Sequence, residues 1–358
     1  MLSARKVVQV MHEYHPPLAG RQGLRLDFNE NTDGCSPRVL ARIRAITAEE
    51  LARYPEREPV ESLVAEYLGL PNEQVLLTNG VDEAIHLLCE TYLEPSLEVI
   101  VITPTFSLYE IFAEATGATV VRVQSGEDLQ FPFEKALQSI TPATRLIAIA
   151  SPNNPTGGVA TREQLLTIAS AAPYAAVLVD EAYYEFHGKT VLSDVVGQQS
   201  LFVARTFSKA YGLAGLRIGI LAGPSEQMAM VERVSSPYSV NIVALAALAV
   251  ALEDAPFVAS YVEQVKVGRQ RLEQELRKAG IPWWPSEANF VLFRVGEKHR
   301  EFVAAMRRRG ILVRDRSRDP GCYGCVRITV GTQVQMDQCL EALREVLAEL
   351  KPSAEVRV

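Results

Sequence analysis

Cysteine is scarce in this sequence, which has only five in 358 residues. A chain of this length with so few cysteines is not built on a disulfide framework, and the odd number leaves at least one thiol unpaired. Cys322 and Cys325 have the spacing of half a zinc site, but no second pair of cysteines or histidines accompanies them. We therefore expect no metal site, and a reducing compartment, the cytoplasm.

Long hydrophobic runs and an excess of positive charge are also lacking. The longest apolar run, residues 242–252, is far shorter than the ~20 residues that span a bilayer, and the first eleven residues contain no apolar stretch of signal-peptide length. Lys and Arg total 36 against 43 Asp and Glu, which gives a formal charge of −7 without any basic block. We expect no membrane span, no export and no nucleic-acid partner.

The sequence is long enough for two domains, with 358 residues, and its hydrophobic share of 48% is sufficient for a sizeable core. Short β-branched runs alternate with longer amphipathic segments, which predicts an α/β domain with a mostly parallel sheet. The predicted strands are residues 75–78, 98–102, 119–123, 146–150, 177–180, 201–205 and 217–221. Helices are predicted at 81–93, 108–116 and 161–171.

After residue 256 the pattern changes to that of a smaller α+β domain. A long charged helix is predicted at 257–279, strands at 289–295 and 325–330, and a last helix from residue 333. The first 45 residues contain one strand-like run, 25–28. We predict an N-terminal arm that joins the small domain (1–45), a large domain (46–256) and a small C-terminal domain (257–358).

Polar residues follow three of the predicted strands of the large domain. Asn154 follows the first of these strands, Asp180 ends the second, and Thr206 to Lys209 follow the third. Ligands of open parallel sheets bind at the carboxyl ends of strands. A desolvated lysine can act as a Schiff-base nucleophile. Pyridoxal phosphate requires such a lysine and a carboxylate on its ring nitrogen, and Asp180 suits this second role.

The ring oxygen and the phosphate of this cofactor would need further partners. Tyr183 and Asn154 are candidates for the ring oxygen. The sequence offers two candidate phosphate-binding sites, called phosphate seats below. One is the turn at residues 79–82, where a strand leads into a helix N-terminus that favours an anion. The other consists of two hydroxyls and a guanidinium, from Thr206, Ser208 and Arg217.

The motifs at these positions resemble those of fold-type I pyridoxal-phosphate aminotransferases of the histidinol-phosphate aminotransferase family. The resemblance extends from Leu26 to the terminal helix. It is carried by the segments Arg53-Tyr54-Pro55, 78–83, 104–109, 151–157, 179–183, 205–217, 289–290 and 326–332.

The resemblance implies specific roles for these residues. Lys209 carries the internal aldimine, and Asp180 and Tyr183 complete the catalytic set. The implied cofactor contacts are Gly80, Val81, Asp82, Phe106 (stacking on the ring), Asn154, Thr206, Ser208, Arg217 and Tyr54. The last reaches the site of a partner subunit, because the family forms homodimers with shared active sites. The implied substrate contacts are Arg314, Arg327, Asn154 and Tyr14.

Several alternatives are open for individual residues and for the reaction. Tyr109 competes with Phe106 as the stacking aromatic, and Arg314, with Arg316 and Arg318 beside it, could belong to a solvated face. The preferred reaction is ping-pong transfer of an amino group from histidinol phosphate to 2-oxoglutarate, which yields imidazole acetol phosphate and glutamate in histidine biosynthesis. The other candidates are an aromatic amino acid aminotransferase, a decarboxylase of a phosphorylated amino acid, and a non-catalytic regulatory module that binds pyridoxal phosphate.

Overall fold

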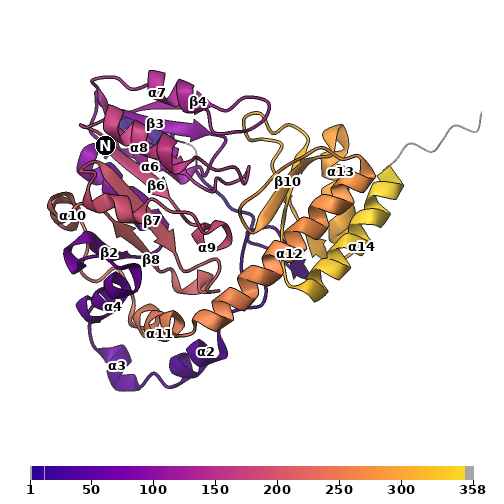
Figure 1. Ribbon diagram of the computed structural model, residues 1–358, viewed down its shortest axis with the longest axis horizontal. Coiled ribbons are helices and arrows are strands. Elements are labelled where there is room, and N and C mark those ends of the chain that lie inside the picture. Colours follow the sequence, from indigo (N-terminus) through magenta and orange to yellow (C-terminus); the bar gives the residue numbers. More distant parts are fainter. Residues whose placement is uncertain (1, 12, 351–358) are drawn as a thin grey trace, which may run out of the picture.

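The computed structural model describes residues 2–11 and 13–350. Its largest element is a seven-stranded sheet with the strand order β2-β8-β7-β6-β5-β3-β4 (Figure 1). Its pairs are parallel except for the two formed by β8, which confirms the mostly parallel α/β sheet predicted from the sequence. The strands are β2 (Val75–Thr78), β3 (Glu98–Thr103), β4 (Thr119–Gln124), β5 (Thr144–Ala150), β6 (Ala176–Asp180), β7 (Leu201–Thr206) and β8 (Gly219–Ala222).

Both faces of this sheet are buried, because successive side chains of a strand point to opposite faces. In β6, Val177 and Val179 belong to one hydrophobic cluster, whereas Ala176 and Leu178 belong to another. One cluster includes residues of α4 (Glu58–Leu68), α8 (Arg162–Ala171) and α11 (Ile242–Glu253). The other includes residues of α5 (Val81–Tyr92), α6 (Leu108–Thr116) and α10 (Ser225–Glu232).

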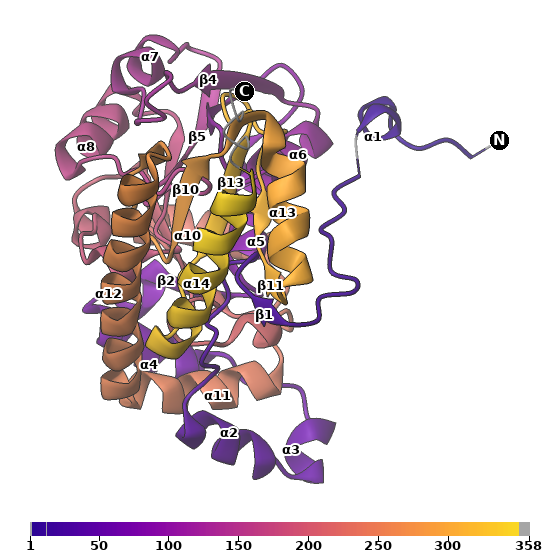
Figure 2. The same ribbon diagram turned by 90° about the vertical axis from the view of Figure 1, so that its right-hand side faces the viewer.

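A second, antiparallel sheet has the order β12-β13-β10-β9 and follows the large one in the sequence. The long helix α12 (Ala255–Ala279) lies beside α14 (Gln333–Leu350), as Figure 2 shows. Near the N-terminus, β1 (Leu24–Arg25) pairs in parallel with β11 (Ile311–Leu312). These pairings are compatible with the predicted domain boundaries, which stay a prediction. The remaining elements of this part are β9 (Trp283–Trp284), β10 (Phe290–Arg294), α13 (His299–Arg308), β12 (Arg314–Asp315) and β13 (Cys325–Thr329).

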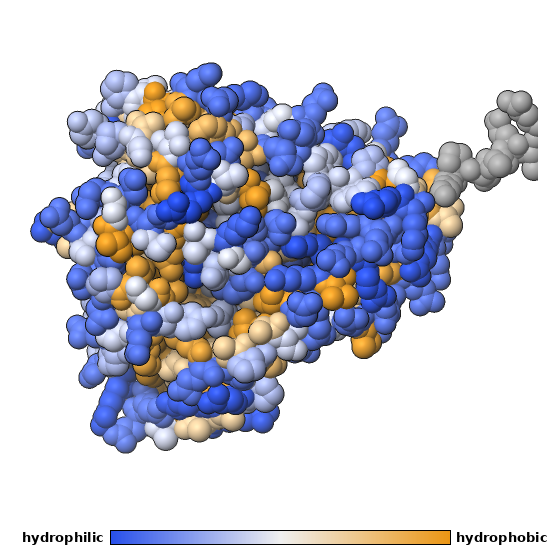
Figure 3. Space-filling model, in the orientation of Figure 1, coloured by the Kyte–Doolittle hydropathy of each residue, from blue (hydrophilic) through white to orange (hydrophobic). Residues whose placement is uncertain are grey.

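Short helices complete the fold: α1 (Lys6–Val10), α2 (Pro37–Arg44), α3 (Ala48–Ala52), α7 (Phe133–Gln138) and α9 (Tyr184–His187). No single helix in residues 2–11 and 13–350 is long and apolar enough to cross a membrane. Only α11 and α12 taken together pass that test, and they are bent by 80° relative to each other. On the face drawn in Figure 3, hydrophobic residues are interspersed among hydrophilic ones.

Two predicted strands were wrong in extent. The strand predicted at 217–221 begins at Gly219, because Arg217 has a left-handed backbone with φ of 54° and follows the 3-10 helix η3 (Ala214–Leu216). Instead of the strand predicted at 25–28, the structure has a strand only at Leu24–Arg25. Both corrections affect segments that contribute to the site described next.

Candidate active site

Three neighbouring strands bring polar residues to one edge of the large sheet. Asp180 is the last residue of β6 and Thr206 is the last residue of β7, while Asn154 lies shortly after the end of β5. These strands pair in parallel, so their carboxyl ends lie together. This is the edge at which open α/β sheets bind their ligands.

A cavity of about 260 Å³, here called the inner cavity, opens at this edge. Its lining includes ten of the predicted site residues, namely Val81, Asp82, Phe106, Asn154, Asp180, Tyr183, Thr206, Ser208, Lys209 and Arg217. Phe28 and Glu30 also line the cavity. The sequence predicted no site role for these two.

The groups predicted to hold a phosphate lie around Arg217. Its guanidinium donates to Ser208 Oγ (3.4 Å) and to Asp82 Oδ2 (2.9 Å). Gly80, the N-cap of α5, has a φ of 78°, and a Cβ built there would lie 2.5 Å from Arg217 Nη2. Glycine therefore allows the guanidinium to approach the helix N-terminus closely. Together with the hydroxyl of Thr206, these groups form a seat suited to an anion.

Lys209 lies in the turn after β7, and its side chain is partly buried. Its Nζ donates a hydrogen bond to the carbonyl oxygen of Phe28 (3.3 Å) and lies 5.9 Å from the centre of the Tyr183 ring. Burial, followed by the charge of Arg327, lowers the pKa of Lys209 to about 8. An appreciable fraction of this amine is therefore neutral near physiological pH, as a nucleophile or general base requires.

Asp180 is a buried carboxylate with two hydrogen-bond donors. It is 5% exposed and accepts hydrogen bonds from Tyr109 Oη (2.5 Å) and from the amide of Ala182 (2.9 Å). Burial raises the pKa of Asp180 to about 6. Tyr109 thus holds the carboxylate, a role that the sequence did not predict. The Phe106 ring packs edge to face against the Tyr109 ring, with ring centres 6.0 Å apart. The position of Tyr109 three residues after Phe106 was the available signal.

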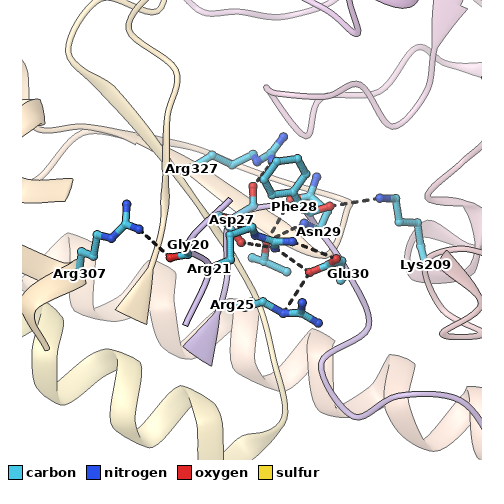
Figure 4. A network of polar contacts seen from close by, with 11 residues as sticks. Gly20, Arg21, Arg25, Asp27, Phe28, Asn29, Glu30, Lys209, Arg307 and Arg327 are labelled. Atoms are coloured by element: carbon cyan, nitrogen blue, oxygen red, sulfur yellow. Dashed lines mark hydrogen bonds and ion pairs between the residues drawn. The ribbon is translucent and has the colours of Figure 1, made fainter. Parts of the chain in front are cut away.

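A second unpredicted residue is Asn29, which holds Tyr183. Asn29 Nδ2 donates to Tyr183 Oη (2.9 Å), and the backbone amide of Asn29 donates to Thr329 Oγ1 (3.0 Å). Asn29 has a φ of 56°, a conformation that asparagine tolerates better than most residues. Figure 4 shows how residues 27–30 lie between Lys209 and Arg327.

A larger cavity of about 910 Å³, the outer cavity, adjoins the inner one. Phe28, Phe106, Asn154, Tyr183 and Lys209 line both cavities. The predicted substrate residues Tyr14, Arg314 and Arg327 also line the outer one.

Arg327 is buried in the wall of the outer cavity and contacts Asn154, which lines both cavities. It donates to Asn154 Oδ1 and to the carbonyl oxygen of Asp27 (2.8 Å), and its Nε has no hydrogen-bond partner among the described residues. Burial, then the charge of Arg316, lowers the pKa of Arg327 to about 9. A buried cation without a carboxylate partner is well suited to bind an anionic substrate.

The alternative that Arg314 and its neighbours form a solvated face was wrong for two of the three arginines. Arg314 is half-buried, with its guanidinium 5.0 Å from the centre of the Phe28 ring. The Arg316 side chain is only 15% exposed, whereas Arg318 is exposed. All three line the outer cavity.

Gly80 lines neither cavity but adjoins Arg217, which lines the inner one. Tyr54 is the other predicted site residue that lines neither cavity. It is 80% exposed and packs against Tyr238, with ring centres 4.7 Å apart. A contribution of Tyr54 to an active site would therefore have to be made in a second subunit.

A model of the family described as aminotransferase class I and II matches residues 21–343. The chain belongs to this family. Histidinol-phosphate aminotransferase of Akkermansia muciniphila is 35% identical to this aminotransferase and covers 90% of each chain. Histidinol-phosphate aminotransferase 2 of Pseudomonas fluorescens is 36% identical and covers 91% of this chain and 89% of the relative.

The fold of this aminotransferase matches that of solved relatives. Histidinol-phosphate aminotransferase of Sinorhizobium meliloti, solved in complex with pyridoxal 5'-phosphate, superposes with a TM-score of 0.87 over 96% of this chain and 97% of that chain, at 24% identity. The resemblance predicted from the sequence and the fold-type I class are confirmed.

Proposed function

We propose that this aminotransferase uses pyridoxal 5'-phosphate to transfer an amino group from histidinol phosphate to 2-oxoglutarate. The family match and the names of the relatives support this activity. The observation that carries the proposal is the position of Lys209, whose lowered pKa of about 8 makes the neutral amine available. It lines both the inner cavity, with the Asp180 carboxylate, and the arginine-rich outer cavity.

The residues of the inner cavity fit the cofactor. The space that a Cβ at Gly80 would fill is taken by the Arg217 guanidinium, which supports an anion seat beside the start of α5. Phe106 offers an aromatic face, and Asp180 offers a buried carboxylate for a cationic ring nitrogen. Tyr183 Oη and Asn154 are the proposed partners of the ring oxygen.

When bound, pyridoxal phosphate would supply an electron-accepting ring that stabilises negative charge on the substrate carbon bearing the amino group. Lys209 Nζ accepts the proton that leaves this carbon, which requires the neutral amine, and would pass it to the cofactor carbon that receives the amino group. Asp180 must stay ionised to hold a cationic nitrogen, and the hydrogen bonds from Tyr109 and Ala182 favour its ionised form.

The outer cavity explains why two different substrates can share one site. Arg327 and Arg314 line it, and both substrates carry anionic groups, a phosphate on histidinol phosphate and two carboxylates on 2-oxoglutarate. Guanidinium groups bind phosphate and carboxylate alike, because both present oxygens that match their planar array of N–H donors.

The proposal is tested by following the visible absorbance of the bound cofactor. Histidinol phosphate should change the spectrum to that of the aminated cofactor, and 2-oxoglutarate should restore it. A change with phenylalanine but not with histidinol phosphate would identify an aromatic aminotransferase instead. Release of carbon dioxide from a phosphorylated amino acid would identify a decarboxylase, and no change with any amine would identify a regulatory module.

We also propose a cytoplasmic homodimer in which Tyr54 completes the partner's site. The exposure of Tyr54 and the five free cysteines support these two points. Lys209→Ala and Tyr54→Ala should each be poorly active alone, whereas a mixed dimer contains one intact site and regains activity. Mixed dimers without any gain would mean that Tyr54 does not act across the interface.

A further inference from the structure

The turn between β12 and β13 contains buried polar atoms without hydrogen-bond partners. Among the described residues these are Ser317 Oγ in the turn and Arg327 Nε in β13, while Arg316 Nε and Asp319 Oδ2 are paired with each other at 2.5 Å. All four residues line the outer cavity. Buried polar atoms are nearly always hydrogen-bonded in folded proteins, so a group of such atoms around one cavity indicates a ligand that supplies the partners.

The turn itself is fixed by its backbone. The amide of Arg316 donates to the carbonyl oxygen of Cys325 (3.0 Å), and the amide of Asp319 donates to the carbonyl oxygen of Arg316 (3.0 Å). The amide of Ser317 donates to Asp315 Oδ1 (2.9 Å). The Arg316 side chain is therefore presented to the cavity by a rigid turn.

The outer cavity has more arginine than carboxylate charge available to balance it. Two of the carboxylates that line it already have other partners. Asp27 is bound by Arg21 (2.6 Å), and Asp315 accepts from the His299 ring (3.0 Å). Of the carboxylates that line this cavity, Asp319 is the one that pairs with a cavity arginine, at 2.5 Å from Arg316 Nε.

Crowding of the arginines has an electrostatic cost. After burial, the charge of Arg316 is the largest cause that lowers the pKa of both Arg314 and Arg327. An incoming anion relieves this repulsion, and an anion of charge near −2 relieves it more than a single carboxylate.

We propose that Arg316 is a specificity-determining residue, the third arginine of an anion subsite with Arg314 and Arg327, and that Asp319 is its internal counter-ion. The inference rests on the proposed function and names the groups that select its phosphorylated donor. A phosphate monoester carries a charge of about −1.5 to −2 at pH 7 and three acceptor oxygens. It displaces Asp319 from Arg316, whereas an uncharged aromatic end leaves the Arg316–Asp319 pair intact.

The test uses holoenzyme variants at positions 316 and 319. Arg316→Gln should raise the KM for histidinol phosphate at least about tenfold, because charge-assisted hydrogen bonds are lost, while kcat changes less than about threefold. The KM for phenylalanine should change less than about twofold. Inorganic phosphate, used to inhibit the half-reaction with glutamate, should inhibit Arg316→Gln at least about tenfold more weakly than the wild type.

Asp319→Asn provides the opposite readout. This variant removes the internal competitor, so inorganic phosphate should inhibit it several-fold more strongly than the wild type. Arg308→Gln is the matched control, because Arg308 is exposed on α13 and does not line the cavity. It removes the same charge and should leave every constant within about 1.5-fold.

The outcomes separate the subsite from the proposed function. If histidinol phosphate is turned over but phosphate inhibition is the same in Arg316→Gln and wild type, the subsite is refuted and the function stands. If the wild type does not accept histidinol phosphate, the function fails, and phosphate inhibition still decides the subsite. The subsite is also refuted if Arg316→Gln raises the KM for histidinol phosphate and for phenylalanine equally, or if inorganic phosphate inhibits Asp319→Asn more weakly than the wild type.

Discussion

The variant Tyr109→Phe removes a single hydroxyl from the wall of the inner cavity. The Tyr109 ring is 1% exposed and would stay in place against Phe106, so the change leaves no ring-sized void. It deletes the hydrogen bond to Asp180 and leaves the amide of Ala182 as the remaining donor to this carboxylate.

The expected effect on Asp180 can be worked out from these contacts. A hydrogen bond to a charged group contributes about 1.5–3 kcal/mol, and each pKa unit corresponds to about 1.4 kcal/mol. The pKa of Asp180, about 6 in the cofactor-free chain, should therefore rise by about one to two units. Because this folded-state pKa lies above the unfolded value, the group reduces stability as pH rises from the unfolded pKa to the folded one.

For the wild type that loss is complete a little above pH 6, whereas in Tyr109→Phe it continues to about pH 7–8. Between pH 5.5 and pH 8, the free energy of unfolding of Tyr109→Phe should thus fall further below that of the wild type, by about 1.5–3 kcal/mol. The measurement is urea unfolding of the cofactor-free protein. Tyr92→Phe is the control, since Tyr92 Oη donates to the neutral Gln227 Oε1 (2.9 Å). A difference for Tyr109→Phe that is as independent of pH as that of the control would refute the reasoning.

Three further predictions concern Lys209 and the phosphate seat. Lys209→Ala should still bind pyridoxal phosphate, retained on dialysis, but lose turnover; appreciable activity would contradict the role of the lysine. The rate at which pyridoxal phosphate associates with cofactor-free protein should rise from pH 7 to 9 with an inflection near 8, because only the neutral amine attacks and the Lys209 pKa is about 8. A rate measured by stopped-flow absorbance that does not vary with pH would contradict this role of the neutral amine. Gly80→Ala should weaken cofactor affinity at least about tenfold in a titration, because its Cβ would lie 2.5 Å from Arg217 Nη2. Gly69→Ala has a similar φ of 70° and no atom within 4 Å, so it should leave cofactor affinity unchanged.

The sequence was sufficient for the parts of the site that depend on local pattern. Strand ends can be recognised from short apolar runs, so Asp180 and Thr206 were predicted at the correct edge of the sheet. The start of β8 was not, because nothing in the apolar pattern indicates the left-handed backbone of Arg217. The side chain of Arg217 contacts Asp82, which is 135 positions away in the sequence.

The residues that sequence reasoning missed act through distant partners. Tyr109 and Asp180 are 71 positions apart, and Asn29 and Tyr183 are 154 apart. No periodicity within a segment encodes such pairs. The same holds for Arg316, whose burial depends on packing around the outer cavity and whose sequence neighbourhood resembles an ordinary charged turn.

The irregular segment at residues 27–30 links parts of the chain that are made at very different times. Phe28 meets Lys209 across 181 positions, and Asn29 meets Thr329 across 300. At about 5–20 residues per second, the ribosome needs roughly 15–60 s to reach Thr329 after it has added Asn29. A nascent chain that already contains Lys209 therefore still lacks the contacts that hold its surroundings. The surroundings of Lys209 are thus completed only after the chain has been synthesised as far as Thr329.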